Sequence, residues 1–212
     1  MTIKVSCEGP EVQSKVAKII EAPEAQPRQR LSGELACGPW ARHALKAGDR
    51  AIEFCLPDRQ GRIISLSKSL QDGPVLLMVS EGGGHDILKT RLFDLAAVYP
   101  RMRAQSVTLI VLAPRWAISD MDDLPFSTLL DSHCSVATAY GLALQAQGQP
   151  RPHCEPMACG EAPADLLDSS VIPATYVISR NGEILFASID ANPTHYLQPS
   201  ALLRMLEALS RR

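Results

Sequence analysis

The central third of this sequence contains no cysteine, because none occurs between Cys55 and Cys134. The chain also lacks an apolar run long enough to cross a membrane. Aromatic residues make up only 5% of it, and its net charge is -2. So small a charge gives no electrostatic reason to expect nucleic acid or an anionic membrane as a partner. The N-terminal residues lack the continuous apolar segment of a secretory signal, so we expect a cytoplasmic protein.

The six cysteines are irregularly spaced, at positions 7, 37, 55, 134, 154 and 159. None of them forms a C-x-x-C pair. In a cytosolic protein of 212 residues, such cysteines are expected to be thiols or reactive groups rather than a disulfide framework. A chain of this length can bury one sizeable core.

Two segments, 1–45 and 145–170, are rich in Pro, Gly and small residues. Residues 1–45 are interpreted as a mobile N-terminal extension or linker with a short helix over Glu11–Ile20, and a dimer arm is the alternative. Residues 46–212 are predicted to form one domain with an inserted loop at 145–170.

Within this domain, apolar patterns of strand and helix type alternate. Two short strands are predicted around a turn at Asp58–Gly61, and buried strands at 74–80, 106–113 and 126–131. Helices are predicted over 118–124, from about 132 to 144, and over 199–209. The helix expected after the first buried strand has one apolar stripe, formed by Leu88, Leu92, Leu95, Ala96, Tyr99 and Met102.

The pair Asn181-Gly182 separates two apolar runs and predicts a tight antiparallel hairpin near the C-terminus. Strands that alternate with helices indicate a parallel sheet. Together these features predict a thioredoxin-like α/β fold. Its mixed sheet has a central parallel part and a C-terminal antiparallel hairpin, and helices flank it.

The stretch "LKAGDRAIEFCLPDRQGRIISLSKSLQDGPVLLMVSEGGG" resembles the opening of peroxiredoxin-like proteins of the alkyl hydroperoxide reductase / thiol-specific antioxidant (AhpC/TSA) family. A later stretch, "VIPATYVISRNGEILFASID", is also similar to that family. The resemblance covers about residues 46–210. It implies an antioxidant peroxide reductase that forms homodimers and uses a thiol reductant. The family pattern G-x-x-A-x-x-F-x-L-x-D-x-x-G-x-x-x-x-L is matched by Gly48, Ala51, Phe54, Leu56, Asp58, Gly61 and Leu66.

In one branch of this family, the turn between strand and helix reads Arg-Gly-Gly-Trp-Cys-Pro-x-Cys. The resemblance implies that a thiolate at the helix N-terminus attacks the peroxide and that a second thiol resolves the sulfenic acid. Here the turn reads "EGGGHDIL", so that His85 and Leu88 take the places of the two cysteines. The catalytic residues of the family are therefore absent. The expected scaffold of the turn is Gly82, Gly83 and Gly84.

His85 is expected to be neutral at a helix N-terminus, as a general base, a metal ligand or a polar turn residue. Asp86 is a candidate N-cap or first-turn carboxylate. Pro173 and Thr175 are candidates for the remaining scaffold of the site, and the matching proline of thioredoxin-type folds is cis. The triple glycine lacks the Gly-Lys-Ser/Thr of a phosphate loop, and no cofactor is expected.

The remaining redox candidates are Cys134, at the start of a predicted helix after His133, and the loop "HCEPMAC". The loop supplies His153, Cys154, Met157 and Cys159, which could bind Cu(I) or Zn(II) with a further ligand from His133 or Cys134. A Cys154–Cys159 disulfide and unligated thiols are the alternatives.

Three hypotheses follow from these residues. The first is a degenerate family member with a binding or regulatory role and a protein partner. The second is a thiol-dependent peroxidase that uses the displaced cysteines. The third is a metal-binding module on the 153–159 loop.

Overall fold

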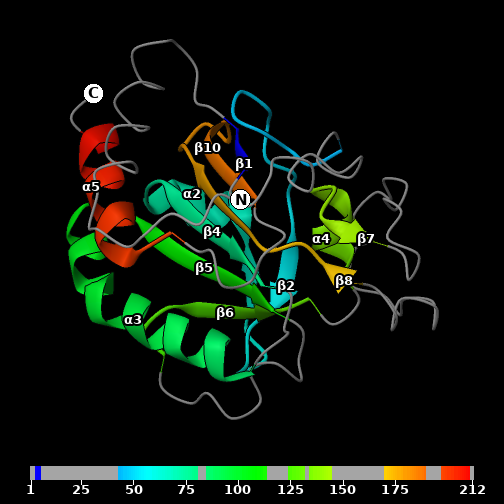
Figure 1. Ribbon diagram of the computed structural model, residues 1–212, viewed down its shortest axis with the longest axis horizontal. Helices are drawn as coiled ribbons and strands as arrows, with labels where there is room; N and C mark the ends of the chain where they lie inside the picture. The colour runs from blue at the N-terminus through cyan, green and yellow to red at the C-terminus, as the bar shows by residue number, and fades with distance from the viewer. Residues whose placement is uncertain are drawn as a thin grey trace, which may run out of the picture.

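The computed structural model describes residues 3–5, 43–80, 85–113, 124–131, 134–144, 170–189 and 197–210. At its centre lies a six-stranded mixed sheet (Figure 1). In spatial order the strands are β1 (Ile3–Val5), β10 (Ile184–Ile189), β9 (Ala174–Ile178), β4 (Val75–Val79), β5 (Thr108–Ala113) and β6 (Ser127–Leu130). The strands β4, β5 and β6 are parallel, whereas β9 is antiparallel to both β4 and β10. This is the predicted thioredoxin-like arrangement.

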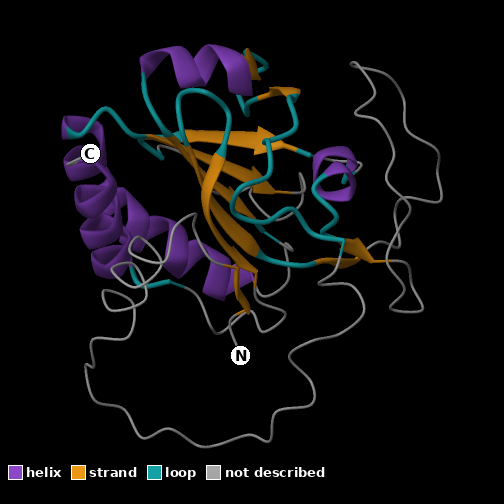
Figure 2. Ribbon diagram, turned by 90° about the horizontal axis from the view of Figure 1, so that it is seen from above, coloured by secondary structure: helices purple, strands orange, loops and turns teal. Residues whose placement is uncertain are grey.

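Helices cover both faces of the sheet, as Figure 2 shows. On one face α3 (His85–Ala104) packs against α5 (Pro199–Ser210), and the predicted apolar stripe of α3 lies in the core between them and the sheet. The other face is covered by α2 (Leu66–Asp72) and α4 (Ser135–Ala139), together with the antiparallel hairpin of β2 (Cys55–Pro57) and β3 (Ile63–Ser65). Because the central strand β4 is covered on both faces, all five of its residues are buried.

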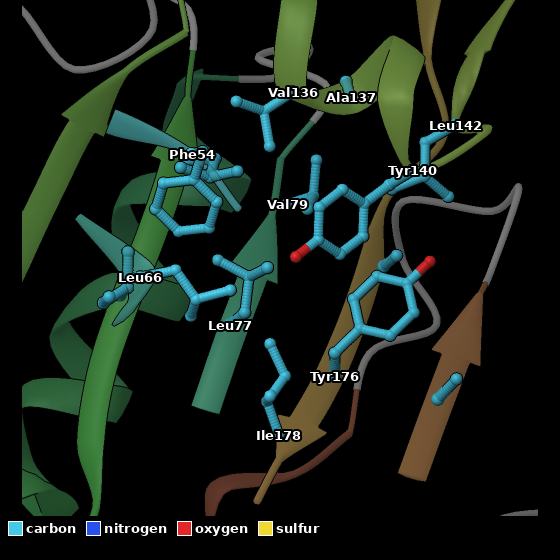
Figure 3. Packing of buried hydrophobic residues seen from close by; sticks show 14 of the residues in the cluster. Phe54, Leu66, Leu77, Val79, Val136, Ala137, Tyr140, Leu142, Tyr176 and Ile178 are labelled. Carbon is cyan, nitrogen blue, oxygen red and sulfur yellow. The ribbon is translucent and has the colours of Figure 1, made fainter. Parts of the chain in front are cut away.

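The core on the α2 and α4 face contains two fully buried tyrosines (Figure 3). The rings of Tyr140 and Tyr176 lie 5.4 Å apart at an angle of 60°. The Tyr140 hydroxyl donates a hydrogen bond to the backbone oxygen of Ile52 at 2.9 Å. This bond links the segment before β2 to the end of α4, and burial raises the pKa of Tyr140 well above its usual value.

The helix predicted to reach residue 144 ends at Ala139, and this part of the prediction is wrong. The chain leaves α4 in a Schellman motif, in which Gly141 donates to Thr138 and Leu142 donates to Ala137. Gly141 has a φ of +72°, which a glycine adopts without steric cost. The next residues form β7 (Ala143–Leu144), which pairs with β8 (Ser170–Val171). The apolar pattern continued past the helix because both elements face the same core.

The short helix α2 was not predicted, because its apolar residues are only Leu66 and Leu70. The predicted helix over Glu11–Ile20 lies outside the described residues, as do 118–123 and most of the 145–170 loop. Among the described helices, none combines the length and apolar character that a membrane crossing requires.

Candidate functional site

The strand-to-helix turn begins at the carboxyl end of β4. The strand ends at Val79, Ser80 is buried, and α3 begins at His85. His85 and Asp86 are therefore the first two residues of the helix, where the family places its first cysteine and the residue after it. Gly82, Gly83, Gly84 and the side chains of His85 and Asp86 lie outside the described part of the structure.

Leu88, in the position of the family's second cysteine, lies in the first turn of α3. Its side chain is only 3% exposed and belongs to the core shared with Leu92, Met78 and Phe126. Burial of a leucine side chain contributes about 1.5–3 kcal/mol of stability. This position therefore serves packing rather than thiol chemistry.

A small pocket lies where the parallel strands end, next to the first residue of the turn. Its volume is about 10 Å³, which is the space of roughly one water molecule. The described residues that line it include no basic side chain, and so none of them supplies a cation that would stabilise a thiolate. The lining consists of Val79, Ser80, Leu112, Ala113, Asp131, Cys134, Ala137 and Val171.

Cys134 immediately precedes α4, and its thiol is 9% exposed. Its backbone lies in the left-handed region with a φ of 53°, which is uncommon for a residue other than glycine. The backbone N–H of Cys134 donates to the backbone oxygen of Asp131 at 3.0 Å and closes this tight connection. The fold thus brings Cys134 to the end of β4, beside Ser80, although 54 residues separate the two in the sequence.

Asp131 positions the whole connection between β6 and α4. Its Oδ1 accepts hydrogen bonds from the backbone N–H of Ser135 at 2.9 Å and from the Ser135 hydroxyl at 3.0 Å. Its Oδ2 accepts from the backbone N–H of Ala137 at 3.0 Å. The two backbone donors are N–H groups of the first turn of α4, which have no partner within that helix. Burial raises the pKa of Asp131, and the hydrogen bonds from Ala137 and Ser135 act in the opposite direction.

Pro173 lies beside the same strand end. The register of β4 and β9 pairs Val79 with Ala174, so Pro173 lies next to Ser80. Thr175 follows in β9, opposite Met78. The peptide bond before Pro173 is trans, in contrast to the cis form that thioredoxin-type folds lead one to expect, since the described backbone contains no cis bond.

Comparison with known families agrees with this arrangement. The family model of the AhpC/TSA family matches residues 47–187, which is more than half of the chain. The chain belongs to the AhpC/TSA family.

Solved structures share the fold of this AhpC/TSA chain at low sequence identity. The peroxidoxin BcpB of Mycobacterium tuberculosis is 20% identical over 78% of this chain and 98% of its own, with a TM-score of 0.55. A yeast mitochondrial 1-Cys peroxiredoxin is 19% identical over 79% of this chain and 77% of its own, with a TM-score of 0.58. A putative thiol:disulfide interchange protein DsbE of Chlorobium tepidum is 16% identical over 79% and 99%, with a TM-score of 0.54. No curated protein matches the chain.

Of the predicted site residues whose side chains the structure describes, Cys134 and Pro173 lie at the carboxyl end of β4, and Thr175 lies opposite Met78 in the same strand. The candidate metal or disulfide residues of the loop, His153, Cys154 and Cys159, lie outside the described residues. Within the described ranges, no group of three or more His, Cys, Asp or Glu side chains could hold a metal ion.

Asp131 was missed as a site residue. Its position, one residue after a buried strand and four before a serine at a helix start, is a signal that could have identified it as a helix cap. Ser80 was missed as well, because a serine that ends an apolar run has no distinctive pattern.

Proposed function

We propose that this chain is an AhpC/TSA family member that does not reduce peroxide at the family's turn and instead has a binding or regulatory role. The main observation that supports this proposal is the burial of Leu88 in the core, at the position of the family's second thiol. His85 at the other position cannot form a sulfenic acid, because it has no sulfur. The turn therefore lacks both groups of the peroxidatic cycle.

The packing near the turn supports this proposal. The nearest described thiol, that of Cys134, is 9% exposed and lines a pocket of about 10 Å³. An organic hydroperoxide does not fit in a space that holds roughly one water molecule. Hydrogen bonds from Ser135 and Ala137 to Asp131 fix the start of α4 directly after Cys134.

The test is a measurement of peroxide consumption. The purified chain is mixed with hydrogen peroxide or cumene hydroperoxide, with dithiothreitol as the reductant. We expect the rate to equal that of a variant carrying Cys134→Ser, Cys154→Ser and Cys159→Ser. A rate clearly above that of the triple variant would overturn the proposal and establish a thiol peroxidase.

A gain-of-function variant tests whether only the thiol is missing. His85→Cys places a thiol at the first residue of the 20-residue helix α3, where helix-terminal N–H groups stabilise a thiolate. We expect this variant to form a sulfenic acid with hydrogen peroxide, detected by dimedone labelling and mass spectrometry. Ile87→Cys, two residues further into the same helix, is the matched control and is expected to label less. Equal labelling of the two variants would show that the helix start gives a thiol no special reactivity.

A second candidate function is a peroxide-responsive thiol at Cys134, which its position beside Ser80 at the end of β4 favours. In that reaction the sulfur attacks the peroxide O–O bond, which forms Cys–SOH and releases an alcohol or water. An added thiol such as dithiothreitol then condenses with the sulfenic acid to a mixed disulfide and releases water, and a second thiol releases Cys134.

Dimedone labelling separates the two candidates. The responsive-thiol candidate requires label on Cys134 after peroxide treatment, both in the wild type and in the Cys55→Ser variant. Cys55 is the matched control because its side chain is exposed. Label on Cys55 with none on Cys134 would exclude this candidate.

A further inference from the structure

A second and larger pocket lies away from the turn, at the outer edge of the sheet. Its volume is about 270 Å³. Pockets for drug-sized ligands measure about 300–1,000 Å³, so this one suits a small molecule. It lies between the β2–β3 turn, the edge strand β6 and the second half of α3. The side chains that matter for its chemistry are Arg59, Gln60, Arg62, Tyr99, Phe126 and Thr128.

Among the described residues that line the pocket, two are arginines and none is acidic. Arg62 is held in place by Asp58, which is 2% exposed and accepts a hydrogen bond from Arg62 Nε at 2.7 Å. Asp58 Oδ1 also accepts from the backbone N–H groups of Gln60 and Arg62, at 2.9 and 2.8 Å. The Nε bond and a longer bond from Nη2 to Gln60 Oε1, at 3.4 Å, use two of the five N–H groups of the guanidinium. Arg59 adds a second guanidinium to the described lining, beside that of Arg62.

Thr128 gives an independent indication of a ligand. Its side chain is 5% exposed, and its hydroxyl oxygen has no hydrogen-bond partner among the described residues. Buried hydroxyl groups are nearly always hydrogen-bonded, because a buried polar atom without a partner destabilises the fold. Thr128 lines the pocket, so a polar ligand bound there could supply the missing partner.

Two aromatic side chains line the pocket. Tyr99 and Phe126 meet edge to face, with ring centroids 5.5 Å apart and an angle of 76° between the planes. Burial raises the pKa of Tyr99, so its hydroxyl stays neutral at physiological pH although the charge of Arg103 acts in the opposite direction. Tyr99 therefore adds no negative charge that would repel an anion.

We propose that this pocket binds a small organic molecule that carries a carboxylate or phosphate group. Arg59 and Arg62 bind the anionic group, and the Thr128 hydroxyl donates a hydrogen bond to it. This proposal rests on the binding role proposed above and names the pocket as the place where the ligand binds. The pocket shares no residue with the turn or the Cys134 pocket, so peroxidase activity would refute the proposed function and leave this site untouched.

Isothermal titration calorimetry of the full chain tests the site, with inorganic phosphate and citrate as the two probes. Arg59→Gln is expected to weaken binding about tenfold, because it removes a charged donor. Thr128→Val keeps the side-chain shape but removes the hydroxyl, and we expect it to weaken binding several-fold. Arg204→Gln removes one exposed positive charge on α5, outside the pocket, and is expected to bind like the wild type.

The melting temperature without ligand distinguishes a binding hydroxyl from a structural one. Because the Thr128 hydroxyl has no partner, Thr128→Val is expected to keep or raise the melting temperature while it weakens anion binding. Binding of either probe with this pattern supports the site, and the preferred probe identifies the anionic group. The proposal is wrong if neither probe binds, if the two pocket variants bind like Arg204→Gln, or if Thr128→Val lowers the melting temperature with unchanged affinity.

Discussion

Replacement of Asp131 by alanine tests how the site next to the turn is held together. The carboxylate accepts two short bonds from backbone N–H groups, from Ser135 at 2.9 Å and from Ala137 at 3.0 Å. A third backbone bond, from Val136, is long at 3.4 Å and is not counted. A hydrogen bond contributes about 1.5 kcal/mol where the ranges for neutral and charged acceptors meet, so the loss of two such bonds is about 3 kcal/mol.

The assay is urea unfolding at pH 7, followed by circular dichroism and extrapolated to zero denaturant. Asp131→Asn retains one carbonyl oxygen, and we expect it to lose about half as much, roughly 1.5 kcal/mol. Asp72→Ala, at an exposed position at the end of α2, is the control and is expected to change the unfolding free energy by less than about 0.5 kcal/mol. If Asp131→Ala also stays within that limit, Asp131 does not hold the connection to α4.

The same variant has a second readout at Cys134. If Asp131 keeps the connection closed, its loss exposes the thiol that lies three residues later. We expect Asp131→Ala to react faster with Ellman's reagent than the parent protein when both carry serine at Cys7, Cys37, Cys55, Cys154 and Cys159, so that Cys134 is the single thiol. An unchanged rate would mean that other contacts bury Cys134.

Two further substitutions test the turns around the domain. Gly141→Ala is expected to lower the melting temperature, because a Cβ at this φ of +72° would lie 2.0 Å from the backbone oxygen of His43. An unchanged melting temperature would contradict this packing. Arg62→Gln is expected to move the acid-unfolding midpoint to higher pH. Burial alone would raise the pKa of Asp58, but the hydrogen bonds and the charge of Arg62 lower it below the ordinary 3.8. The ionised Asp58 therefore stabilises the fold at pH values above 3.8. This stability is lost as the pH falls through the pKa that Asp58 has in the folded protein. A midpoint that does not move, measured by circular dichroism, would show that Arg62 does not set this pKa.

The sequence predicted the fold well where periodicity and turn chemistry agree. The run 74–80 became the buried strand β4, and the stripe that begins at Leu88 became the inner face of α3. Asn181-Gly182 marked the hairpin of β9 and β10. These features are local, because an apolar face or a glycine in a turn restricts the backbone whatever the rest of the chain does.

The candidate site could be predicted only in part. The absence of both cysteines from the turn was readable from the residues, because no thiol lies between Cys55 and Cys134. The placement of Cys134 beside Ser80 was not, because it depends on the parallel pairing of β4, β5 and β6. The early end of α4 was missed because an apolar residue continues a helix pattern and begins a strand pattern equally well.

The sequence by itself determined the buried strands of the sheet, the two long helices that flank it, the family resemblance and the absence of cysteine from the turn, because these depend on residue type and on spacing along the chain. Only the tertiary structure decided which distant residues share a pocket. It buried Leu88, brought Cys134 to the end of β4 and left the Thr128 hydroxyl without a partner beside two arginines. The physical reason is that burial, and the cost of an unpaired polar atom, depend on long-range packing that no local pattern encodes.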